Sequence, residues 1–87
     1  MKPDLGKLIT LTEDLECGHP IEAILRQHGI HERWSACEVV MRQAKSREYA
    51  ATAVSEYYRQ FWKDAVAELE PCIKAIALYF EEGNYVP

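Results

Sequence analysis

The fold is decided by residues 47–82, which read REYAATAVSEYYRQFWKDAVAELEPCIKAIALYFEE. Placed at roughly 100° per residue, one set of side chains falls on a single apolar face of a helix. That set is Ala51, Val54, Tyr58, Phe61, Trp62, Ala65, Leu69, Cys72, Ile73, Ile76, Tyr79 and Phe80. Charged residues such as Glu56, Lys63 and Lys74 fall on the opposite face. The pattern predicts a long amphipathic helix that contains most of the aromatic side chains of the chain.

A proline interrupts this predicted helix at position 71. An interior proline costs about 3 kcal/mol because it removes a backbone donor and clashes with the preceding turn. The apolar pattern continues across Pro71, which itself falls on the polar side, where a kink can open towards water. Two alternatives stay open: one helix kinked at Pro71, which we favour, or two helices meeting end to end with Pro71 in the first turn of the second.

The length of this helix restricts the architecture. A straight helix over residues 47–82 would run roughly 54 Å, whereas a compact domain of this size has a radius of gyration of about 12 Å. The residues before position 47 are too few to cover so long an apolar face. We therefore expect that the helix bends back on itself at Pro71 or that a second chain covers it.

Three shorter helices are predicted before the long one. Residues 1–16 are predicted as a short helix, although the run 8–12 fits an extended segment equally well. Thr10 or Thr12, followed by acids, is typical of a helix N-terminus.

The next two helices have clearer signals. Pro20–His28 is predicted as a helix because proline suits the first helical position and Gly29 can adopt the left-handed conformation that ends a helix. Ser35–Lys45 begins with the capping box formed by Ser35 and Glu38. The join to the long helix is predicted at residues 45–47, so the fold class is a small all-α bundle of three short helices and one long one.

Composition indicates one small soluble domain over residues 1–87. The chain is 48% hydrophobic and 28% charged, and its length is near the lower limit for burying a sufficient core. No apolar run approaches the ~18 residues that span a bilayer, and the N-terminus lacks the features of a signal peptide. Three cysteines do not make a disulfide framework. We expect a cytoplasmic protein with no membrane partner.

The net charge of −4 conceals an uneven distribution. Residues 39–63 carry only two acids against five bases, which are Arg42, Lys45, Arg47, Arg59 and Lys63. The segments on either side are acidic. An acidic chain with a basic middle is compatible with antiparallel self-pairing or with a charged partner, although solvated helix faces would give the same pattern.

A cluster of cysteine and histidine residues is the candidate metal site. Cys17, His19, His28 and His31 could together bind zinc through sulfur and imidazole ligands. Their spacing matches no established zinc pattern, however, and no CxxC pair is present. The histidines could equally be exposed residues at a helix end, and Cys37 is expected as a small core residue. Structural roles are the favoured explanation, with no cofactor. The alternative function is that of a metal- or redox-responsive regulator with its Cys/His site at Cys17–Cys37.

Nucleic-acid binding and catalysis have weaker support. The basic segment 42–63, near Tyr49 and Tyr57, could stack single-stranded bases, but Tyr58, Phe61 and Trp62 are expected in the core. The chain has no glycine-rich phosphate loop and no G-x-S-x-G elbow. We expect that this chain is not an enzyme and that nucleic acid is not its partner.

Protein interaction is the leading functional hypothesis. The aromatic face is longer than the remaining short helices can bury, and tyrosine and tryptophan are enriched in binding hot spots. We expect a homodimer, a larger protein partner, or both, contacted through the region 57–80. The candidate partner-binding residues are Tyr49, Tyr57, Arg59, Lys63, Leu78 and Tyr85. Such a chain would serve as an adaptor, inhibitor or assembly factor.

Overall fold

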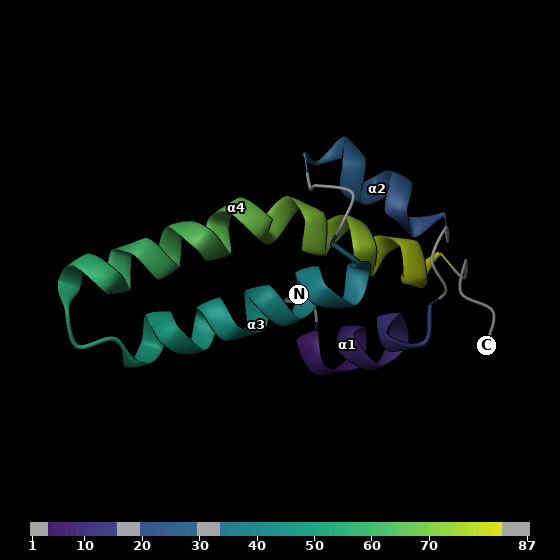
Figure 1. The fold of residues 1–87 in the computed structure, drawn as a ribbon. Coiled ribbons are helices and arrows are strands. Elements are labelled where there is room, and N and C mark those ends of the chain that lie inside the picture. The colour runs from purple at the N-terminus through teal and green to yellow at the C-terminus, as the bar shows by residue number, and fades with distance from the viewer. Residues whose placement is uncertain (1–3, 16–19, 30–33, 83–87) are drawn as a thin grey trace.

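The computed structural model describes residues 4–15, 20–29 and 34–82 (Figure 1). Within these ranges the chain forms helices and no strand, which confirms the predicted all-α bundle. The helices are α1 Leu5–Glu13, α2 Ile21–Gln27, α3 Ala36–Thr52 and α4 Glu56–Glu81.

The two longest helices, α3 and α4, form an antiparallel hairpin around which the rest is arranged (Figure 1). Helix α1 packs on α3, and α2 packs mainly on the C-terminal half of α4, so both short helices lie at the same end of the hairpin. We call that end the base. Beyond it, α3 and α4 continue without the short helices as a two-helix arm, residues 42–68, and the molecule measures 43 × 24 × 20 Å.

The hydrophobic core occupies the base. It contains Leu8, Ile21, Leu25, Ala36, Val39, Val40, Leu69, Cys72, Ile73 and Ile76. The predicted burial of the apolar face of α4 is thus confirmed from Leu69 to Ile76. It is wrong on the arm, where Tyr58 is 57% and Phe61 is 51% exposed, because there only α3 packs against α4.

The chain reverses direction at residues 53–55, so the predicted join at 45–47 is wrong, and the long helix does not fold back on itself at Pro71. Ala53, with an extended backbone, ends α3, and Ser55 precedes α4. The Arg59 guanidinium stabilises the turn, since its Nη2 donates to the Ala53 carbonyl oxygen (3.1 Å) and its Nη1 pairs with Glu56 (2.6 Å). A reversal here lets α3 and α4 pack along most of their lengths, which a helix continuous over residues 47–82 could not do.

Helix α4 continues through Pro71, so the alternative of two helices meeting there is wrong. Pro71 and Ala67 are both exposed. The Ala67 carbonyl, which has no helical donor because proline lacks an N–H, can therefore bond water instead. A kink at Pro71 stays a prediction.

The predicted bounds of α2 and the predicted start of α3 agree with the structure, but the predicted start of α1 does not. The Ser35 hydroxyl accepts from the Glu38 N–H, and the Glu38 carboxylate accepts from the Ser35 N–H, which is the predicted capping box. Gly29 has φ of 78°, as predicted. Helix α1, however, begins after Asp4, whose side chain accepts from the Lys7 N–H, and the predicted start at Thr10 or Thr12 is wrong. Thr12 is buried inside α1.

Candidate interaction surface

Five aromatic side chains lie together on one side of the arm, and we call them the aromatic patch. They are Tyr49, Tyr57, Tyr58, Phe61 and Trp62. Ring centroids are 4.9 Å apart for Tyr49 and Trp62 and 5.0 Å apart for Phe61 and Trp62, while Tyr57 and Tyr58 are 5.2 Å apart. The patch therefore extends from α3 across to the outer side of α4.

Most of the patch faces solvent. Tyr57 is 72% exposed and Tyr49 is 41% exposed, and only Trp62, in the middle, is half-buried. Tyr58, Phe61 and Ala65 continue by helical spacing the same face of α4 that carries Leu69, Cys72 and Ile76. This face is covered at the base and bare on the arm.

A groove lies beside the patch on the α3 side. Its volume is about 360 Å³, and it is lined by Glu38, Met41, Arg42, Lys45, Ser46, Tyr49 and Trp62. The Arg42 guanidinium lies over the Trp34 ring, 4.5 Å from its centroid, which positions one cation at the edge of the groove. The arm therefore combines exposed rings with nearby positive charge.

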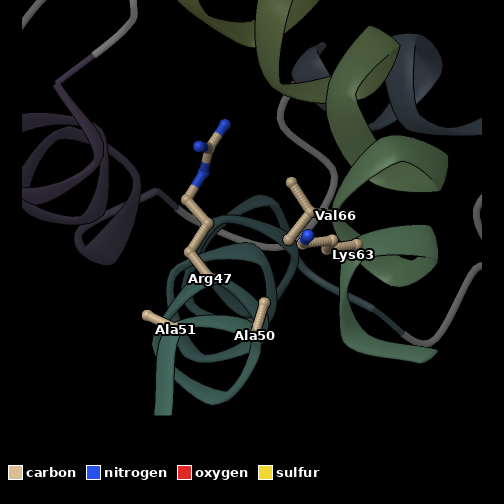
Figure 2. A pocket seen from close by; sticks show the side chains of 5 residues that line it. All are labelled: Arg47, Ala50, Ala51, Lys63 and Val66. Carbon is tan, nitrogen blue, oxygen red and sulfur yellow. The ribbon is translucent and has the colours of Figure 1, made fainter. Parts of the chain in front are cut away.

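A second, shallower hollow lies on the other side of the seam between α3 and α4 (Figure 2). Arg47, Ala50, Ala51, Lys63 and Val66 line its volume of about 320 Å³. In Figure 2 the guanidinium of Arg47 extends away from the ammonium of Lys63. The guanidinium pairs instead with Glu70, since Arg47 Nη2 lies 3.0 Å from Glu70 Oε2. The two cations do not converge, so this hollow lacks the geometry of an anion site.

The structure separates the predicted partner-binding residues into groups. Tyr49 and Tyr57 belong to the aromatic patch. Lys63 lies in the hollow across the seam, and Arg59 holds the 53–55 turn. Leu78 is 53% exposed but lies near the base end of α4, roughly 25 Å along the helix from Phe61 at 1.5 Å per residue. Tyr85 lies outside the described residues.

Sequence reasoning missed Tyr58 and Phe61 as surface residues because it assigned them to the core; Trp62, which it also assigned there, is half-buried. The sequence did contain a signal for this exposure, because two helices alone can bury only the side chains along the seam between them. Side chains in that seam include Ser46, Ala50, Trp62 and Val66, which are buried or half-buried.

The seam also contains a polar contact that was not predicted. Gln43 is completely buried, and its Nε2 donates to the Val66 carbonyl oxygen (3.2 Å) and to Glu70 Oε2 (2.8 Å).

The predicted metal site falls mainly outside the described residues. Cys17, His19 and His31 lie there, and His28 is exposed. Among residues 4–15, 20–29 and 34–82, no three histidine, cysteine or acidic residues are grouped to hold a metal ion. Cys37 was expected in the core but is only half-buried. Cys72 is buried, and this burial raises the pKa of its thiol to about 11. Metal binding stays a prediction.

Comparison with known proteins finds no family model, no curated protein and no solved structure that matches this chain. Among the helices of the described ranges, none combines the length and apolar character needed to cross a bilayer. The function therefore has to be inferred from the geometry of the arm.

Proposed function

We propose that this chain is a small non-enzymatic protein-interaction module that binds a protein partner through the aromatic patch on its arm. One observation carries the proposal: four of the five patch side chains are exposed, and two of them, Tyr58 and Phe61, continue an apolar face of α4 that is buried at the base. Contiguous exposed apolar surface marks interaction sites in soluble proteins. The free thiols of Cys37 and Cys72 favour a reducing compartment such as the cytoplasm.

The patch has the physical properties of a binding hot spot. The rings of Tyr49, Trp62 and Phe61 are in contact across two packed helices, and Tyr57 contacts Tyr58, so binding orders few additional side chains. Tyrosine and tryptophan contribute a large share of interface energy because each offers a broad apolar surface with one polar group. Burying the patch would complete the coverage that α2 begins at the base.

The test compares two variants with matched exposure on the same helix. Phe61 is 51% exposed in the patch, and Leu78 is 53% exposed near the base. We expect Phe61→Asp to weaken partner binding by about 2 kcal/mol, roughly thirtyfold, and Leu78→Asp to leave it nearly unchanged. The immobilised variants would be incubated with cell extract, and retained proteins would be quantified by mass spectrometry.

Circular dichroism of both variants would show that each retains its helices. Equal retention of every bound protein by the wild type, Phe61→Asp and Leu78→Asp would contradict a role for the arm. Loss on Leu78→Asp alone would move the interaction surface to the base.

A further inference from the structure

We propose that the partner of the arm is a second copy of this chain, and that two arms pack side by side, pointing in the same direction, as a four-helix bundle. This inference rests on the proposed function, because it names the partner of the same aromatic patch. It is carried by the charges along the two edges of the patch and by the apolar area between them.

The two edges of the patch have opposite charge. On α3, Arg42 and Lys45 precede Tyr49 by seven and four residues, so helical spacing aligns them with it in one exposed row. On the outer side of α4, Asp64 and Glu68 follow Phe61 by three and seven residues in a second exposed row. We call these rows the basic edge (Arg42, Lys45) and the acidic edge (Asp64, Glu68).

The two edges also lie at matching heights along the arm. The contact between Tyr49 and Trp62 sets the register of α3 against α4. Counting from that contact towards the base, Lys45 and Asp64 differ in height by two residues, about 3 Å. Arg42 and Glu68 differ by one residue, about 1.5 Å.

A two-fold axis parallel to the arm makes this surface complementary to itself. Such an axis places α3 of one copy over α4 of the other, since rotation about it exchanges the two edges. The basic edge of each copy then faces the partner's acidic edge, and the aromatic patches face each other. Pairing the arms in opposite directions would instead place α3 over α3, with like-charged edges on the same side. The charges therefore select the first arrangement.

The exposed apolar area is sufficient for a stable dimer. At about 200 Å² per aromatic side chain, the exposed fractions of Tyr49, Tyr57, Tyr58 and Phe61 amount to roughly 450 Å². A standard interface buries about 800 Å² per partner, of which about 60% is apolar. The patch alone thus supplies nearly the whole apolar part, with the charged edges as the polar rim.

The overall charge does not prevent this pairing. Each copy has a net charge of −4, but at physiological ionic strength repulsion is screened beyond about 8 Å. The short helices lie only at the base, so the proposed contact is between the two arms (Figure 1).

The experiment reverses the charge of one edge at a time in two separate variants and then mixes the two purified variants. The first variant is Arg42→Glu with Lys45→Glu, and the second is Asp64→Lys with Glu68→Lys. Each puts like charges opposite one another in its own homodimer, so we expect the dissociation constant to rise about tenfold or more. Native mass spectrometry and sedimentation would measure the dimer, with circular dichroism as the check of folding.

The mixture tests whether the two edges meet at the interface. The two variants alone test the orientation, because in antiparallel arms like charges already face each other in the wild type, and reversing one edge would leave the dissociation constant nearly unchanged. In a heterodimer of the two variants both pairs of edges again carry opposite charge, so an equimolar mixture should form heterodimers well in excess of the statistical half. A mixture that stays monomeric while each variant is folded would overturn the parallel pairing, and so would homodimers that both variants leave intact.

The failure of this inference can be distinguished from the failure of the proposed function. A wild type that remains monomeric at high micromolar concentration, while Phe61→Asp still releases a partner protein from extract, would overturn self-pairing and leave the interaction role of the arm standing. A wild-type dimer that Phe61→Asp does not weaken would overturn self-pairing through the patch, and the proposed function would fall as well only if Phe61→Asp also retained every protein from the extract.

Discussion

The side-chain amide of Gln43 lies in the seam between α3 and α4 and links the two helices. It donates to the Val66 carbonyl oxygen and to the Glu70 carboxylate, which Arg47 also contacts. Among the described residues no buried side-chain nitrogen or oxygen lacks a hydrogen-bond partner, so this polar contact is fully satisfied. A buried amide with a single set of partners favours one register of α3 against α4. The heights of the charged edges on the arm depend on that register.

Cys72 predicts a specific dependence of stability on pH. Burial raises the pKa of its thiol from 9.0 to about 11 in the folded protein. Because the folded state keeps the proton that the unfolded chain releases, the stability from Cys72 is complete below pH 9 and declines as the pH rises towards 11. We expect the urea midpoint to fall more between pH 8 and about 10.5 in the wild type than in Cys72→Ala. Equal losses would contradict this.

At the scale of elements, α3 and α4 begin in different ways. Ser35 forms a capping box with Glu38, whereas the side chain of Ser55 makes no capping hydrogen bond at the start of α4. The start of α4 is held instead by the contacts of Arg59 with Glu56 and with the Ala53 carbonyl oxygen. The same residue type therefore has unequal importance at the two helix starts.

This difference predicts unequal effects of one substitution. Ser35→Ala should lower the free energy of unfolding by about 1 kcal/mol, because the Glu38 N–H loses its partner, while Ser55→Ala should change it by only about 0.3 kcal/mol. Urea denaturation followed by circular dichroism would measure both. A larger loss for Ser55→Ala would mean that its hydroxyl caps α4 in solution.

At the scale of the whole molecule, we expect the base to supply folding stability and the arm to supply the binding surface. The base contains the buried core, and the arm carries aromatic side chains that the fold does not cover. An 87-residue domain has a total stability on the order of 5–10 kcal/mol, and a buried, unpaired charge costs several kcal/mol of it. We therefore expect substitutions in the core of the base to impair folding, and the proposed function predicts that substitutions in the aromatic patch weaken association.

Aspartate substitutions at two positions of α4 would distinguish the contribution of the base to folding from the contribution of the arm to binding. Ile76 is fully buried at the base, and Phe61 is half exposed on the arm. Ile76→Asp should abolish the cooperative thermal transition, while Phe61→Asp should keep helical circular dichroism and a cooperative transition at low protein concentration. Unfolding of Phe61→Asp under these conditions would show that the arm is part of the folding core.

The local features of the fold could be predicted from the sequence. The capping box at Ser35, the left-handed Gly29 and the buried face from Leu69 to Ile76 all follow from interactions within a few residues or from helical periodicity. Four helical segments and no strand were predictable on the same grounds. Of the candidate surface, Tyr49 and Tyr57 were predicted correctly as exposed.

By itself, the amino-acid sequence determined the helices and their apolar faces, and the tertiary structure decided where the chain reverses and which faces are covered. The reversal at residues 53–55 is favoured by the packing of α3 along α4, a gain that exists only in the folded molecule. Periodicity likewise shows that Tyr58 and Phe61 lie on an apolar face, but exposure depends on whether another helix reaches them. Helices α1 and α2 are too short to do so, and this leaves the aromatic patch on the arm open to solvent.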